Sequence, residues 1–188
     1  MFKKIIFVNI FLLLFLGAVE PITPIPLSAT VNTKKADLGR ELFFDSRLSK
    51  DDRVSCHSCH LLSQGGVDNK KLSVGVDGKL GIINSPTILN STFSFSQFWN
   101  GRAKNLHEQA FGPISDPNEM AMNFKDLENK LRKTDYLKKF FSIYKDGITI
   151  NNIVDAIVEY EKTLITPNSP FDKYLRGDET AISEEAKR

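Results

Sequence analysis

The sequence has little cysteine and no excess of charge of either sign. Two cysteines among 188 residues exclude a scaffold held together by several disulfides. Lys and Arg number 25 against 23 Asp and Glu, and the first 18 residues hold Lys3 and Lys4 but no acid. Without those 18 residues the balance is therefore 23 against 23. This neutrality argues against nucleic-acid binding, which needs a basic surface.

Long apolar runs are missing everywhere except at the N-terminus. Residues 5–19 are apolar apart from Asn9 and Gly17, and they follow two lysines. A basic start and an apolar run of about 15 residues are typical of an export signal and short for a membrane span. We expect residues 1–19 to be a signal peptide, or an uncleaved anchor because Leu16 weakens cleavage after Ala18. Export predicts a periplasmic protein.

The remaining composition is that of one globular domain, so wholesale disorder and fibrous repeats are excluded. Residues 20–35 contain three prolines and are expected to form an extended tether. Residues 45–100 are rich in Ser, Gly, Asn and Asp and show no helical or alternating period. So long an irregular stretch is unusual unless a bound group organises it. Helices are expected elsewhere, at residues 35–44, 104–111, 123–132, 134–145, 149–164 and 169–176.

The helix at 149–164 has the clearest pattern. Thr149 can cap its start, and Pro167 is expected to end it. Its apolar residues recur at helical spacing and form one stripe. They are Ile150, Ile153, Val154, Ile157, Val158 and Leu164.

Both cysteines belong to one motif, Cys56-His57-Ser58-Cys59-His60. Thiols three residues apart on a helical turn can each add to one vinyl group of a haem, and the next residue, His60, then supplies the proximal imidazole. His57 would be a bystander at the surface. The sequence therefore predicts one covalently bound haem c, with His60 on the iron.

Three other interpretations of the motif are weaker. A zinc site would pack four ligands too tightly, and no second ligand pair follows. A thioredoxin-like Cys-x-x-Cys would need a preceding strand, which the sequence lacks. A simple disulfide between Cys56 and Cys59 would leave His60 unexplained.

The other face of the iron decides between electron transfer and peroxide chemistry. His107, Met120 or Met122 could bind there as a second axial ligand. Glu119 could instead move a proton between the two oxygens of a peroxide over an open face. By residue type alone, Glu119 is equally a solvated loop residue and the methionines are core residues.

Several blocks around the motif, in order along residues 36–188, resemble the N-terminal haem domain of bacterial dihaem cytochrome c peroxidases. The blocks are LGRELFFDSRLS at 38–49, NSPTILN at 84–90, QFWNGRA at 97–103, EQA at 108–110, GPI at 112–114, NEM at 118–120, EYEKTL at 159–164 and PNSPFDKYLRGD at 167–178. The resemblance implies an all-α fold, a c-type cytochrome domain with long irregular loops wrapped around the haem. That domain would span residues 36–178.

The resemblance also implies a role for each matching residue. Glu119 would be the distal acid–base and Gln109 its neighbour in the pocket. Trp99 would lie on the electron path between two haems; unaided, its residue type predicts a core aromatic. Asn84 would bind a calcium ion at the domain interface. Hydrogen peroxide would be the substrate and a small cytochrome c or cupredoxin-like protein the electron donor, with a homodimer as the assembly.

Two departures from the family pattern affect these expectations. Many members carry a distal histidine where this sequence has Val76, which cannot bind iron, so the iron is expected to be five-coordinate or water-bound. The family also carries a second haem motif, which this sequence lacks, and residues 179–188 would begin that second domain. The competing hypotheses are accordingly a peroxidase module, a monohaem electron carrier and an inactive fragment of the dihaem enzyme.

Overall fold

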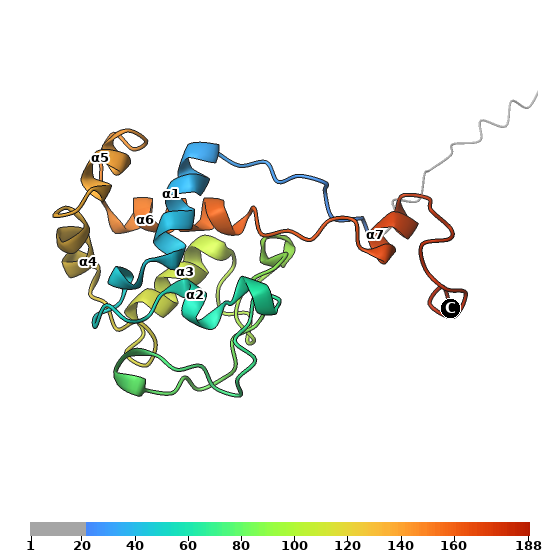
Figure 1. Cartoon of the computed structure of the whole chain (residues 1–188), viewed down its shortest axis with the longest axis horizontal. Coiled ribbons are helices and arrows are strands. Elements are labelled where there is room, and N and C mark those ends of the chain that lie inside the picture. The colour runs from blue at the N-terminus through green and yellow to red at the C-terminus, as the bar shows by residue number, and fades with distance from the viewer. Residues whose placement is uncertain (1–21) are drawn as a thin grey trace, which may run out of the picture.

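The computed structural model describes residues 22–188, and the predicted signal peptide lies outside them. The described chain is helical, with two isolated β-bridges and no strand (Figure 1). Its α-helices are α1 (Thr33–Phe44), α2 (Cys56–Cys59), α3 (Leu106–Ser115), α4 (Phe124–Leu131), α5 (Tyr136–Phe141), α6 (Ile150–Glu161) and α7 (Pro170–Leu175). The predicted all-α class is therefore confirmed. Within this part of the chain no helix is both long and apolar enough to cross a membrane.

Helices α1 and α6 pack directly on each other at the centre of the molecule. A Cβ atom added at Gly39 on α1 would overlap the carbonyl group of Ala156 on α6, so only glycine allows this approach. The side chain of Thr149 accepts a hydrogen bond from Asn152 N (3.2 Å) and caps α6, as predicted. This helix pair forms the support on which the other elements lie.

The predicted apolar stripe of α6 is buried along most of its length. Ile153, Val154, Ile157 and Val158 are all nearly inaccessible to solvent. The helix ends at Glu161, earlier than the predicted stop before Pro167, so Leu164 lies beyond it. The stripe therefore ends in a buried carboxylic acid rather than in a leucine.

The irregular region between α1 and α3 is as the sequence predicts. It contains α2 and four 3₁₀ turns, which are Ser46–Leu48, Leu62–Gln64, Val76–Gly78 and Ser91–Phe93. Backbone bonds fix this region onto the helices: Asn90 N donates to Leu164 O (2.8 Å), and Val76 N donates to Glu119 O (2.8 Å). A small apolar cluster of Phe43, Ile88 and Tyr160 packs against Cys56 and so positions α2.

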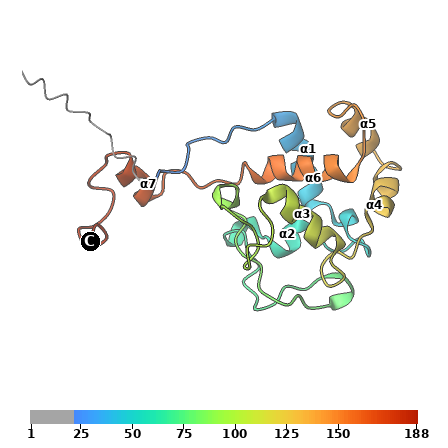
Figure 2. The same cartoon turned by 180° about the vertical axis from the view of Figure 1, so that it is seen from behind.

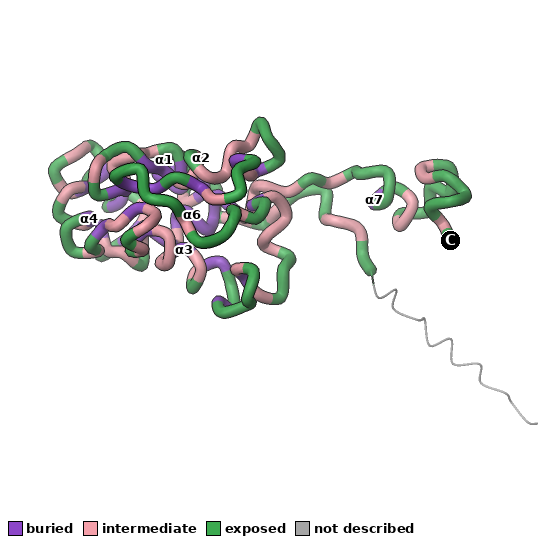
Figure 3. The backbone as a smooth tube through the Cα atoms, turned by 90° about the horizontal axis from the view of Figure 1, so that it is seen from below, coloured by how far each residue is buried: buried purple, intermediate pink, exposed green. Residues whose placement is uncertain are grey.

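The segment before α1 runs beside the segment after α6, and both lead away from the globular body (Figures 1 and 2). Ile25 N donates to the carboxylate of Asp172 on α7 (2.7 Å), and the Arg176 guanidinium donates to Ile25 O. Buried residues concentrate in the body, whereas the C-terminal part is mostly exposed (Figure 3). Helix α1 begins at Thr33, so the end of the predicted tether at 20–35 is helical, which corrects that boundary.

The close contact between α1 and α6 gives a first prediction. Gly39→Ala would force the two helices apart and lower the free energy of unfolding by about 2 kcal/mol or more. Gly81→Ala is the matched control, because the added methyl group meets nothing nearer than 3.6 Å. It should change the free energy of unfolding by less than about 1 kcal/mol. Equal urea-unfolding midpoints for the two variants would contradict the packing described above.

Candidate haem site

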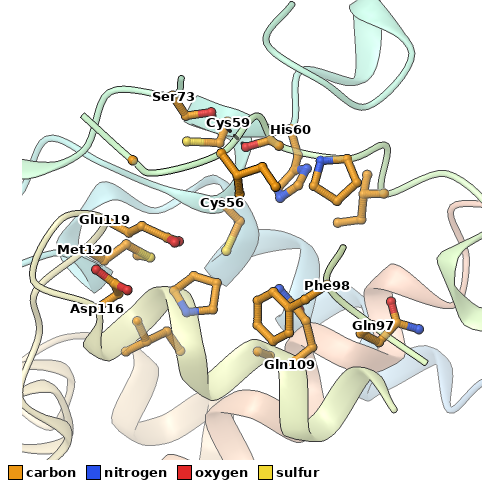
Figure 4. Close-up of a pocket in the computed structure, with 18 of the residues that line it drawn as sticks. Cys56, Cys59, His60, Ser73, Gln97, Phe98, Gln109, Asp116, Glu119 and Met120 are labelled. Atoms are coloured by element: carbon orange, nitrogen blue, oxygen red, sulfur yellow. Dashed lines mark hydrogen bonds between the residues drawn. The ribbon is translucent and has the colours of Figure 1, made fainter. Parts of the chain in front are cut away.

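One cavity of about 320 Å³ lies between α2, α3, the end of α6 and the irregular loops. It brings together six of the residues that the sequence singles out. Its lining includes Cys56, Cys59, His60, Trp99, Gln109 and Glu119. The close-up shows His60 and Glu119 approaching the space from different sides (Figure 4). Asn84, the predicted calcium ligand, lies at the same cavity.

The motif folds as the spacing requires. Cys56 and Cys59 are the first and last residues of α2, so the two thiols are one helical turn apart. Both cysteines are free and both line the cavity. Burial raises the pKa of both thiols above its usual value. Among residues 22–188 no three His, Cys, Asp or Glu side chains are grouped to hold a metal ion.

The His60 ring is oriented by one backbone bond. Its Nδ1 lies 3.1 Å from the carbonyl oxygen of Gly66. Because a carbonyl only accepts, Nδ1 must carry the proton, which leaves the lone pair of Nε2 free. Burial lowers the pKa of His60 and favours this neutral form. His60 is thus prepared as a metal ligand through Nε2.

The cavity fits a haem in its chemistry as well as in its residues. Two thiols and a neutral imidazole supply the attachment points and the axial ligand. Two buried oxygens without hydrogen-bond partners, Ser91 Oγ and Glu161 Oε2, belong to residues that line the cavity. Buried polar atoms normally have partners, so these orphaned atoms are consistent with a bound group.

Glu119 lies on the loop that follows α3. Its backbone is fixed twice, since its N–H donates to Asp116 O (3.1 Å) and its carbonyl accepts from Val76 N (2.8 Å). Burial raises the pKa of its carboxyl group, and the nearby Asp116 carboxylate raises it further, while Arg102 opposes the change. A carboxyl group with a raised pKa holds its proton more readily than an ordinary carboxyl group, which suits it to taking up and returning a proton.

Gln109 is placed by helix α3. The side chain of Asn105 caps that helix by accepting from Glu108 N (2.9 Å). Pro113 lies inside the helix and also lines the cavity. Gln109 and Pro113 are four residues apart, so one helix face presents both to the cavity.

Trp99 lies at the edge of the cavity and is 61% exposed. Its Nε1 donates to the carbonyl oxygen of Asn84 (3.0 Å), which joins two loops. Interpreting Trp99 as a core aromatic is therefore wrong. The Arg102 guanidinium lies 3.4 Å from the centre of the Phe98 ring, and both residues line the cavity.

The candidate axial ligands differ in whether they line the cavity. Met120 is 2% exposed and lines the cavity, whereas Met122 is a core residue outside its lining. His107 Nε2 lies 3.3 Å from Asp155 in a different surface hollow, so His107 is not a candidate. Val76 is buried in the core.

His57 differs from its predicted role as a surface bystander. Its ring centroid lies 4.5 Å from that of Phe44, and its Nδ1 is buried without a partner. It is therefore part of the packing around α2.

Sequence reasoning missed two acids of the cavity, Asp116 and Glu161. Glu161 follows Ile153 and Ile157 at intervals of four residues, so it falls on the apolar stripe of α6. A carboxylate on a stripe that is otherwise apolar was the signal that could have revealed it. Asp116 offered no comparable signal, because Asp before Pro117 is an ordinary turn residue.

Comparison with known proteins agrees with the architecture. Residues 33–180 match the family model described as Di-haem cytochrome c peroxidase. The chain belongs to the di-haem cytochrome c peroxidase family. A solved structure has a similar fold. The chain superposes on the crystal structure of a MauG-like protein associated with microbial copper homeostasis with a TM-score of 0.75 and 28% sequence identity. That match covers 93% of this chain and 52% of the other.

Curated relatives of this peroxidase family are more similar in sequence. Cytochrome c peroxidase Ccp of Escherichia coli is 49% identical over 90% of this chain and 37% of its own length. Cytochrome c551 peroxidase of Nitrosomonas europaea is 46% identical over 90% of this chain and 52% of its own. The chain thus spans about a third of the length of the first relative and about half that of the second.

The position of Trp99 gives a second prediction, because it is the only tryptophan in the sequence. A chromophore bound in the cavity should quench most of its fluorescence by energy transfer. Emission should return in a Cys56→Ala, Cys59→Ala variant that cannot attach haem, measured at equal concentration. Trp99→Phe supplies the baseline. Equal emission from the wild-type chain with attached haem and from the double variant would place the haem elsewhere.

Proposed function

We propose that this chain is a haem c protein that reduces hydrogen peroxide to water with electrons from a small redox donor. The observation that carries the proposal is the joint placement of a Cys-x-x-Cys-His motif and Glu119 on one cavity. Relatives named cytochrome c peroxidase, 46–49% identical, support the same function.

Cys56 and Cys59 would hold the haem through two thioether bonds, and His60 Nε2 would bind its iron. The bound haem supplies redox chemistry that no side chain can provide. The hydrogen bond to Gly66 O keeps the imidazole in the ligating tautomer throughout.

Glu119 would act as the acid–base of the reaction. As a carboxylate it takes a proton from one oxygen of the peroxide, and as an acid it returns that proton to the departing oxygen as water forms. The Gln109 amide would orient the peroxide by hydrogen bonding. Overall, one peroxide, two electrons and two protons give two molecules of water.

The electrons must reach the cavity from outside. The sequence has one haem motif, and one haem iron holds one electron when it is reduced. The reduction of peroxide takes two electrons, so a second haem domain or a partner protein would supply the second one. Trp99, exposed at the edge of the cavity, would lie on that path. A cytochrome c or a cupredoxin-like protein is the proposed donor.

The remaining features of the proposal follow the family resemblance. Residues 36–178 would form the haem domain, which would be periplasmic and would assemble as a homodimer. Asn84 would contribute to a calcium site.

A monohaem electron carrier is the second candidate, because Met120 lines the cavity and could bind iron through its sulfur. The optical spectrum of the ferric protein separates the two candidates. A low-spin spectrum with a methionine–iron charge-transfer band would exclude the peroxidase function. A high-spin spectrum that changes on adding peroxide would exclude the carrier.

Replacing the acid–base gives a third prediction. Glu119→Gln should leave haem attachment intact and lower peroxide turnover about 10²–10⁴-fold. Glu108→Gln is the control, since Glu108 lies on α3 outside the cavity lining and accepts a bond from Lys104 N (2.9 Å). Turnover by both variants should be followed by oxidation of the reduced donor. Equal turnover would remove Glu119 from the mechanism.

The charge of Asp116 gives a fourth prediction, about pH. Glu119 must be ionised to accept a proton, so turnover should fall as pH drops through its raised pKa. Asp116→Asn removes the negative charge that helps raise this pKa, so the acid side of the pH–rate profile should move to lower pH, by about half a unit or more. Asp126→Asn, on α4, should leave the profile in place. An unchanged profile in Asp116→Asn would show that Asp116 does not act on Glu119.

A further inference from the structure

The carboxyl group of Glu161 lines the haem cavity and has no function in the mechanism above. It lies at the C-terminal end of α6, and the residue is 5% exposed. Its Oε2 is buried without a hydrogen-bond partner. A buried, unpartnered acid destabilises a fold relative to an apolar residue of similar size, so its presence on an apolar stripe calls for a functional explanation.

Among the described residues, no cationic side chain lowers the pKa of Glu161. From α2 it faces the Cys56 thiol, whose pKa its charge helps to raise. From α1, Arg40 acts on the neighbouring Tyr160. Directly after α6, Lys162 Nζ donates to the carboxylate of Glu159 on that helix (2.6 Å).

The other titratable groups of the cavity come from elements beyond α6. They are Cys59, His60, Arg102, Asp116 and Glu119. On α3, His107 is engaged with Asp155 outside the cavity, and on α4, Glu128 is engaged with Arg132. Burial consequently raises the pKa of Glu161 to about 8, so the carboxyl group can change its charge near neutral pH.

We propose that Glu161 is a redox-linked proton acceptor, which takes up one proton when the iron beside it is reduced and releases it on oxidation. This inference rests on the haem position in the proposed function. The donor protein supplies one electron, which converts ferric to ferrous iron. Solvent supplies one proton, which forms the O–H bond of the Glu161 acid, and no other bond changes.

The coupling has an electrostatic origin. Ferric iron carries one more positive charge than ferrous iron, and a nearby carboxylate in a medium of low dielectric constant interacts strongly with that charge. The pKa of Glu161 is therefore higher when the iron is ferrous than when it is ferric. Reduction at neutral pH then draws a proton into the cavity, where peroxide reduction consumes protons.

The sign of the pH dependence follows from these two pKa values. At low pH the carboxyl group is neutral in both oxidation states, and the midpoint potential is at its upper plateau. Between the ferric-state and ferrous-state pKa values the potential falls as pH rises, by about 59 mV per pH unit for one proton per electron. Above both values the potential reaches its lower plateau.

The test is a spectroelectrochemical titration of the full chain with its haem attached, from about pH 5 to pH 9. The wild-type potential should fall with pH as described. Glu161→Gln keeps the shape of the side chain but cannot ionise, so the fall in potential that the wild type shows around pH 8 should be absent. Glu159→Gln is the matched control on the same helix, because the Glu159 carboxylate is paired with Lys162 and lies outside the cavity lining; it should keep the wild-type slope.

Several outcomes would overturn the inference. A wild-type potential that does not vary with pH would do so, as would an unchanged slope in Glu161→Gln, or a slope abolished in Glu119→Gln but kept in Glu161→Gln. If Glu161→Gln fails to attach haem, redox-difference infrared spectroscopy of the wild-type chain decides instead. A protonated-carboxyl band should appear on reduction and shift on isotopic labelling of glutamate; no such band would refute the role of Glu161.

The readouts separate this inference from the proposed function. Haem attachment is checked by mass and optical spectrum, and peroxide turnover is measured apart from the potential. A pH-dependent potential in a chain without peroxide turnover would support Glu161 and contradict the peroxidase. Peroxide turnover in a wild-type chain whose potential does not vary with pH would support the peroxidase and contradict the role of Glu161.

Discussion

The direct contact between α1 and α6 is the constraint on which the rest of the structure depends. Because Gly39 has no side chain, the backbone of α1 reaches the Ala156 carbonyl, and the two helices form one rigid support. The end of α1 then places Phe43, whose ring centroid lies 5.2 Å from that of Tyr160 on α6. Cys56 packs against this aromatic pair, so the haem motif inherits its position from the helix pair.

The second half of the site is held by backbone rather than by side chains. The 3₁₀ turn that starts at Val76 donates to Glu119 O, and a side chain at Gly75 would overlap the same loop. The loop that follows α3 and carries Glu119 therefore lies against the segment at Gly75 and Val76, which follows the haem motif in the sequence.

Much of this architecture was predictable from local chemistry. The Cys-x-x-Cys-His spacing is highly specific for haem attachment, and the cap at Thr149 and the apolar stripe of α6 follow directly from helix geometry. The packing of His57 against Phe44, the exposure of Trp99 and the early end of α6 were not predictable. The first two are decided by contacts with segments distant in sequence, Phe44 beside His57 and Asn84 beside Trp99. Glu161 lies between these cases: its place on the apolar stripe of α6 is visible in the sequence, whereas its lack of a hydrogen-bond partner shows only in the folded structure.

The pairing of the two chain ends has a mechanical consequence. Asp172 is buried although it is an acid, and it holds the backbone of Ile25 while also closing the first turn of α7 through Ser169. A pulling force applied to the chain before Ile25 would load this clamp first, in shear, before it reached α1. Tension on the N-terminal side would therefore reach the globular body through α7 and the segment that follows α6, as well as through residues 26–32.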